Sequence, residues 1–324
     1  MAGRATVNRQ VQIGVESTPG TPVPANKSLP SLSLSLTRAL ETKQFRSQGF
    51  KPETANQIIK DYGRGTVSGP LNYTEVIYAL NSLVTGVIAT PGGGTLSRTH
   101  TFTPAGIGAD AFKTFTIQEG DSTAARQMAN SIFSEFGVTT SLSTAEINGA
   151  ILGTTPISTT LTASPTAIAL LPVNIREIDL YMDTTFAGLG TTKITDAEAA
   201  EFKITNKYAL KWVLNTTNTS FKDIVEMPPS LTFSFTTEDN AQSRTLYDSL
   251  NTNPVKYLRL QCTGPIIETT LPYYIKLDAG CYVTAAEQTD VDGVWSYKFD
   301  CRPMYTPTFP GAWAVVVQNT LTAL

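Results

Sequence analysis

Charged residues, histidine and cysteine are all scarce in this chain of 324 residues. Charged residues make up 16% of the sequence, whereas ordinary soluble domains carry about 25%. The net charge is −3, and a protein that holds nucleic acid by neutralising phosphates needs a basic excess, so that class is excluded. No apolar run approaches the roughly 18 residues of a membrane span. The N-terminal residues 1–9 lack the apolar core of a signal peptide, so we expect synthesis and folding in a cytoplasm.

The residue types of most catalytic and metal sites are nearly missing. His100 is the only histidine, and no nucleophile turn lies beside it. Cys262, Cys281 and Cys301 are an odd set without metal-ligand spacing, and their apolar strand phases predict reduced thiols in a core. Asp290-Val291-Asp292-Gly293 is similar to the start of a calcium loop, but Asp-Gly between two alternating runs favours a hairpin turn. The sequence therefore predicts no enzyme, no cofactor and no metal site.

Threonine and serine are abundant instead, at 49 and 22 positions. Threonine is β-branched and suits a half-buried pleated surface, so its excess favours strands. Strict alternation of apolar and polar residues marks several segments, which predicts antiparallel strands packed on one side. These segments are 31–36, 178–183, 231–236 and 257–262, followed by the hairpin of 275–281 with 295–301. We expect a mainly β fold, an antiparallel sandwich or barrel with a few short helices.

Four segments have helical patterns. The segment 72–83 has apolar residues at helical spacing behind Asn72 or Thr74 as a cap, and 237–250 has an acidic first turn that suits the helix dipole. Shorter candidates cover 195–202 and 52–62. We expect these helices to pack against the sheet.

The order of elements repeats along the chain. In each half an alternating strand leads through a long polar connection to a second strand, a helix, a third strand and a closing hairpin; the first such hairpin would pair 133–138 with 145–151. This order predicts an internal duplication. The predicted organisation is an extended arm over 1–30, a first β domain over 31–160, and a second over 161–324 with a C-terminal extension.

Three segments carry a family resemblance. The opening 12–25, with its run Ser17-Thr18-Pro19-Gly20-Thr21-Pro22, resembles the start of tail tube (major tail) proteins of long non-contractile-tailed bacteriophages, and 115–121 and 136–142 are similar to the late strands of that fold. The resemblance implies a structural virion protein of the phage tail. Its subunits would form closed rings by joining sheets edge to edge, and stacked rings would form the conduit for genome delivery.

The resemblance also implies partners. The chain would bind copies of itself, with three duplicated chains per pseudo-sixfold ring favoured over six, and would meet tape measure and tail terminator or tip proteins. Double-stranded DNA would pass through without specific binding, and no membrane is involved. A secreted or surface β-rich adhesin or lattice protein, a decoration-type virion protein, and an enzyme of unrecognised type remain alternatives.

The arm and the long connections are expected to make contacts between subunits. Prolines bar the arm from a helix or a central strand, so it would dock on a neighbour through Gly14, Glu16, Pro19, Pro22 and Pro24. The connections 38–64 and 184–229 would reach the next ring, and the first offers Arg38, Lys43, Arg46 and Lys51.

The lumen is expected to be net negative, because each phosphate met by a base would add affinity and hinder transit. The acids on polar strand phases are the candidates for its lining: Glu119, Glu135, Glu146, Asp278 and Asp300, with Asp179 and Asp183 less clearly placed.

Overall fold

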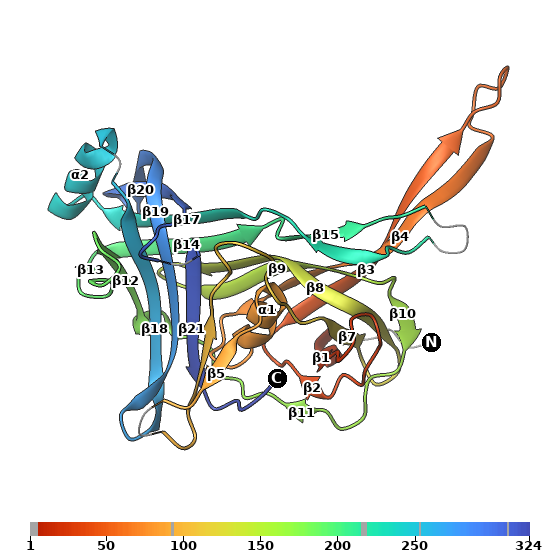
Figure 1. Ribbon diagram of the computed structural model, residues 1–324, viewed down its shortest axis with the longest axis horizontal. Coiled ribbons are helices and arrows are strands. Elements are labelled where there is room, and N and C mark those ends of the chain that lie inside the picture. Colours follow the sequence, from red (N-terminus) through yellow and green to blue (C-terminus); the bar gives the residue numbers. More distant parts are fainter. Residues whose placement is uncertain (1–5, 92–93, 215–218, 253, 310) are drawn as a thin grey trace.

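The computed structural model describes residues 6–91, 94–214, 219–252, 254–309 and 311–324. Strands dominate it and nearly all pair antiparallel, which confirms the expected mainly β chain with few short helices (Figure 1). The helices of the described residues are α1 (Val76–Leu83), α2 (Ala241–Asp248) and the short turns η1 (Thr6–Asn8), η2 (Ile175–Glu177) and η3 (Ser249–Asn251).

Eight strands form one antiparallel sheet that runs through both halves of the chain. Their order is β3 (Ser33–Phe45), β4 (Ala55–Pro70), β9 (Ala145–Gly153), β8 (Ala125–Thr140), β14 (Ala197–Thr205), β17 (Ser230–Glu238), β20 (Val294–Pro303) and β19 (Leu271–Val291). The joint between the halves is β8–β14, where Phe202 lies opposite Val138.

The long strands β8 and β19 each continue into a second layer. Beside β8 lie β7 (Phe115–Gly120), β1 (Gln10–Val15), β2 (Lys27–Ser28) and β10 (Ile157–Thr159), with β11 (Thr166–Ala167) parallel to β2. Beside β19 lie β18 (Lys256–Glu268), β12 (Ile178–Asp183), β13 (Lys193–Ile194), β21 (Trp313–Asn319), β6 (Arg98–Phe102) and β5 (Val87–Ala89). A separate hairpin joins β15 (Tyr208–Lys211) to β16 (Asp223–Glu226).

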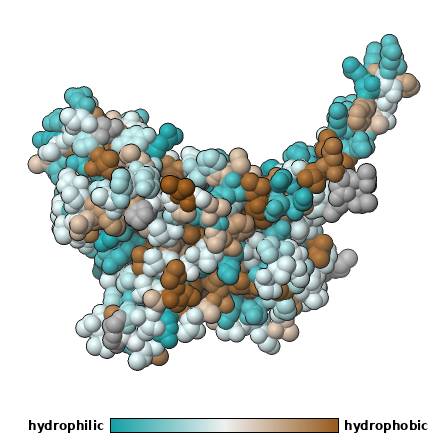
Figure 2. Space-filling model, viewed as in Figure 1, coloured by the Kyte–Doolittle hydropathy of each residue, from teal (hydrophilic) through white to brown (hydrophobic). Residues whose placement is uncertain are grey.

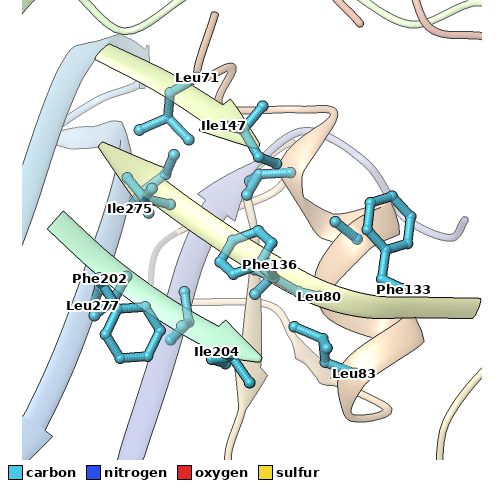
Figure 3. Packing of buried hydrophobic residues seen from close by; sticks show 14 of the residues in the cluster. Leu71, Leu80, Leu83, Phe133, Phe136, Ile147, Phe202, Ile204, Ile275 and Leu277 are labelled. Carbon is cyan, nitrogen blue, oxygen red and sulfur yellow. The ribbon is translucent and has the colours of Figure 1, made fainter. Parts of the chain in front are cut away.

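One hydrophobic core lies between these layers. Every residue of α1 is buried, and its Leu80 and Leu83 lie beside Phe136 of β8 (Figure 3). Phe202 of β14 and Leu277 of β19 belong to the same cluster. The predicted domains 31–160 and 161–324 therefore share a core and a sheet.

The two halves use the same order of strand pairing. The first half pairs β1–β7–β8–β9–β4–β3, and the second pairs β12–β18–β19–β20–β17–β14. Each long strand has a bulge at the same point, at Ser134 in β8 and at Thr284 in β19. The bulged hydroxyl donates to the carbonyl of Ala150 at 3.2 Å in the first half and to that of Asp300 at 2.9 Å in the second.

Two of the four predicted helices are present. The helix of 72–83 forms over Val76–Leu83, but neither expected cap precedes it directly: its N-cap is Glu75, which makes no capping bond. The segment 237–250 contains α2, which is capped by Asn240. The predictions for 195–202 and 52–62 are wrong, because these segments lie in β14 and β4. Pairing with β8 and β17 holds the first as a strand, and pairing with β3 holds the second.

The long connections are also more regular than expected. The segment 38–64 is an antiparallel hairpin of β3 and β4 with a turn over 46–54. The segment 184–229 contains β13, β14, β15 and β16, while its residues 215–218 lie outside the described residues.

Candidate assembly surfaces

The hairpin of β3 and β4 projects from the body of the molecule (Figure 1). Leu40, Phe45, Phe50, Ile58 and Ile59 are exposed on it, with Phe50 the most exposed at 61%, and Figure 2 shows hydrophobic residues among hydrophilic ones along this projection. A row of large apolar side chains on a projecting strand pair is typical of a surface that another molecule covers. We call residues 38–62 the projecting hairpin.

Three of the four basic residues expected to reach the next ring are exposed on the projecting hairpin: Lys43, Arg46 and Lys51. The Lys43 ammonium lies 5.4 Å from the centre of the Phe45 ring. Arg38 differs, because its guanidinium forms an ion pair with Asp61 across the hairpin.

The base of the projecting hairpin is held by the segment from β15 to β16. The Trp212 ring meets Tyr62 at 5.8 Å in an edge-on contact, and the Lys60 ammonium lies 5.3 Å from the centre of the Trp212 ring. The backbone N–H of Asp61 donates to the carbonyl of Thr219 at 3.1 Å. These contacts fix the direction in which the projecting hairpin leaves the body.

The eight-stranded sheet has one polar face. The inward phase of its strands carries core residues such as Val67, Phe202 and Phe299. The opposite phase, which we call the polar face, carries hydroxyls together with six acids and four bases. They are Glu135, Glu146, Glu201, Glu238, Glu287 and Asp300, and Arg64, Lys203, Lys298 and Arg302.

Three of the predicted lumen acids lie on the polar face: Glu135, Glu146 and Asp300. Glu201, Glu238 and Glu287 lie there too but were not predicted. The alternation of β14 could have identified Glu201, but its residues Ala197-Glu198-Ala199-Ala200 favour a helix when taken alone.

Glu119 and Asp278 are not free surface charges, and that prediction is wrong for both. Glu119 is 6% exposed and forms an ion pair with Arg9. Asp278 is 5% exposed and accepts two hydrogen bonds from Arg259, at 2.6 and 2.8 Å. Their positions on β7 and β19 turn these carboxylates inward, so each needs a partner in place of water.

Asp179 and Asp183 lie on β12, outside the eight-stranded sheet. Asp179 forms an ion pair with Lys193. Asp183 is buried and accepts hydrogen bonds from the backbone N–H of Gly190 and the hydroxyl of Thr191, at 2.9 and 3.0 Å. Both therefore have partners within the chain.

The predicted arm is largely part of the subunit, so the expectation that residues 1–30 bury little on their own chain is wrong. Residues 10–15 form β1, with Val11 and Ile13 buried against β7. A Cβ on Gly14 would lie 2.3 Å from the carbonyl oxygen of Pro24, so this glycine permits close backbone packing. Pro19, Pro22 and Pro24 lie exposed in the loop before β2. Residues 1–5 lie outside the described residues.

Glu16 fastens this loop to the body. Its carboxylate is 4% exposed and accepts hydrogen bonds from Gly20 N, Asn130 N and the hydroxyls of Thr114 and Thr116, at 2.8 to 2.9 Å. Charge-assisted bonds of this kind are among the stronger ones in proteins.

The sheet has two open edges. Among the described residues, β3 pairs only with β4, and residues 284–291 of β19 pair only with β20. Unpaired N–H and C=O groups along such edges are templates for pairing with another strand.

The titratable residues of the interior do not assemble into a reaction centre. His100 is buried, and its Nε2 donates to the carbonyl of Leu321 at 3.0 Å. All three cysteines are free and buried, and burial raises the pKa of Cys262 and Cys301 to about 12. Within the described residues there is no group of three or more histidine, cysteine or acidic side chains placed to hold a metal ion.

No helix in the described part of the chain is both long and apolar enough to cross a membrane. A scan of protein-family models finds no match to the chain, and a search of curated proteins finds none either.

Proposed function

We propose that this protein is the structural subunit of a tube made of stacked rings, of the kind that forms the tail conduit of long non-contractile-tailed bacteriophages. The observation that carries the proposal is the joint between β8 and β14 together with the two open edges, β3 and β19. In this reading the halves are duplicated copies of one unit, and the joint inside the chain is the template for the joint between chains.

The pairing ladders support this correspondence residue by residue. Ile151 and Cys301 lie beside the two bulges, opposite Phe133 and Val283. From Ile151 the ladder runs through Gly65 to Leu36. From Cys301 it runs through Phe233 to Phe202.

Leu36 of β3 thus corresponds to Phe202 of β14. Gln288 lies four residues beyond the bulge of β19, as Val138 does in β8. Phe202 lies opposite Val138 in the internal joint. The same joint between two chains would place Leu36 opposite Gln288, and Thr37 opposite Glu287.

Ring closure gives this arrangement its physical advantage. A sheet with two open edges is prone to uncontrolled pairing, and a closed barrel has no edge. Three chains of eight strands each would close a barrel of 24 strands with six nearly equivalent units. The polar face would then line a water-filled lumen with an excess of two acids per chain, which suits the passage of DNA.

The projecting hairpin would join one ring to the next. Its direction is fixed at Tyr62 and Trp212, and its exposed apolar residues need a cover that the subunit does not supply. Burying such side chains removes apolar surface from water, which favours stacking. Tape measure and terminator or tip proteins would complete the assembly at its centre and ends.

Disulfide trapping tests the ring joint. Thr37→Cys and Glu287→Cys, combined in one chain, place two thiols on opposite strands of the proposed joint, where Cα atoms lie about 4.5–5.5 Å apart, within disulfide range. Oxidised assemblies should run as covalent trimers in denaturing gels, and electron microscopy should show rings or tubes. Thr37→Cys with Lys298→Cys is the matched control, because β20 lies one strand away from the edge.

Discrete monomers at every concentration, or equal cross-linking in the control pair, would overturn the ring. Flat sheets in the microscope would favour a lattice protein instead. A covalent series ending at six chains would support the six-chain ring.

A further inference from the structure

A cleft of about 530 Å³ runs along the open edge of β3 beside Leu36. Ser35, Leu36 and Thr37 form one wall, and Arg9, Glu119 and Arg126 lie around it. This cleft borders the backbone that the proposed ring joint would use.

Two charged side chains occupy the edge groups of Leu36. The Glu119 carboxylate accepts a hydrogen bond from the Leu36 N–H at 2.8 Å. The Arg126 guanidinium donates to the Leu36 carbonyl at 3.0 Å. Arg9 forms an ion pair with the same carboxylate. Both backbone groups of Leu36 therefore point away from β4 and already have partners within the subunit.

We propose that Glu119 and Arg126 act as an edge guard, which closes the ring-forming edge of the free subunit and is displaced by the strand of the neighbouring copy. This inference rests on the proposed function, because it concerns regulation of the same joint. The guard holds the N–H and C=O that the backbone of the neighbour's Gln288 would otherwise bond. Charged side chains at an exposed strand edge are a known means of preventing premature pairing.

The internal joint supplies a comparison. Phe115 pairs with Ser131, three residues before the bulge in β8, and Lys256 pairs with Cys281, three residues before the bulge in β19. Four residues beyond Phe115 is Glu119, opposite Arg126, and four beyond Lys256 is Leu260, opposite Leu277.

Leu260 and Leu277 are buried core residues. The internal joint is covalently tied into one chain and always formed, so its edge strand needs no guard. The charged pair thus stands only beside the edge that stays open until another chain arrives.

Assembly would exchange partners without leaving a buried group unsatisfied. The Leu36 N–H passes from Glu119 to the Gln288 carbonyl, and the Leu36 carbonyl passes from Arg126 to the Gln288 N–H. Glu119 keeps Arg9 as its counter-ion. Because two charge-assisted bonds must break before the first new bond forms, the guard would slow nucleation more than elongation.

Amide hydrogen exchange of the free subunit tests the guard directly. The variant Glu119→Leu with Arg126→Leu carries the residue type found at 260 and 277. We expect the Leu36 amide to be protected in the wild type and to exchange about tenfold faster or more in this variant. Glu146→Gln, an exposed acid on the polar face, is the control and should leave Leu36 unchanged. Equal exchange of Leu36 in wild type and variant would overturn the guard.

Light scattering during assembly is the second readout. The guard variant should show a shorter lag than the wild type at equal concentration, with the 37–287 cross-link still formed. Wild-type assembly and cross-linking with an unchanged lag in the variant would overturn the guard alone. A wild type that never forms the cross-link overturns the ring joint and the guard together. If the leucine pair does not fold, Glu119→Gln and Arg126→Gln are measured in the same way, and faster exchange of Leu36 with a shorter lag is again required.

Discussion

Replacing Glu16 should strongly destabilise the free subunit, although this residue lies in a segment whose sequence suggests a loose arm. Gly20 is exposed, so water can replace the carboxylate as acceptor for its N–H. The hydroxyls of Thr114 and Thr116, which are 2% and 0% exposed, and the Asn130 N–H would lose a buried acceptor in Glu16→Ala. At about 1 kcal/mol for each donor left without a partner, the free energy of unfolding should fall by about 3 kcal/mol.

Glu16→Gln should have a smaller effect. The amide oxygen can keep the two bonds that Oε1 now accepts, from Thr116 and Asn130. The new NH₂ group faces Gly20 N–H and the Thr114 hydroxyl, and the hydroxyl can rotate to accept from it. A loss of about 1 kcal/mol is expected.

Urea unfolding of the free subunit, followed by tryptophan fluorescence, measures both losses. Glu41→Ala is the control, because Glu41 and Lys60 form an exposed ion pair whose removal should cost less than about 0.5 kcal/mol. If Glu16→Ala matched this control, β1 and its loop would not be docked on the subunit, and the extended arm would be the better description.

Three further results are expected. Phe45→Ser with Phe50→Ser should leave the unfolding midpoint of the subunit unchanged, because both side chains are exposed, while stopping tube growth in electron micrographs; normal tubes would refute a role for the projecting hairpin in stacking. Burial lowers the pKa of His100, so the unfolded chain binds the proton more readily and stability should fall as the pH drops below about 6.5; His100→Gln should flatten unfolding curves compared between pH 5 and 7, and an unchanged slope would contradict this. Burial raises the pKa of Cys262 and Cys301, so an aromatic disulfide reagent should label these thiols only after denaturant is added, and rapid labelling of the native protein would contradict their placement.

The closing hairpin of the second half shows where local sequence is sufficient. Asp292 and Gly293 both have positive φ, at +52° and +85°, as the tight turns that join two strands require. The flanking residues alternate in polarity on both sides, so turn and strand signals agree. The predicted strand 178–183 matches β12 for the same reason.

The segment 195–202 shows where local sequence misleads. Its alanines and glutamates favour a helix, yet Ala200 and Phe202 lie between β8 and β17 with every backbone direction set by two neighbours. The arm failed in a similar way, because prolines in the loop 19–24 say nothing about Val11 and Ile13, which pair with distant β7.

The buried acids show a third limit. Alternation places Glu119 and Asp278 on a defined phase of their strands, but it does not tell whether that phase faces solvent or a partner. Arg259 is 19 residues from Asp278 in the chain, and Arg9 is 110 residues from Glu119. Such pairs exist only after the strands have found their neighbours.

The sequence by itself determined the mainly β class, the hairpin turns, the reduced cysteines and the lack of a familiar catalytic or metal-binding pattern, because each depends on residue type or on near neighbours along the chain. The tertiary structure alone decided that the two halves share a sheet, that β3 and β19 remain open, and that the projecting hairpin leaves the body at Tyr62. These features depend on which strands pair across more than a hundred residues. A period of two fixes the face of a strand but not its neighbour.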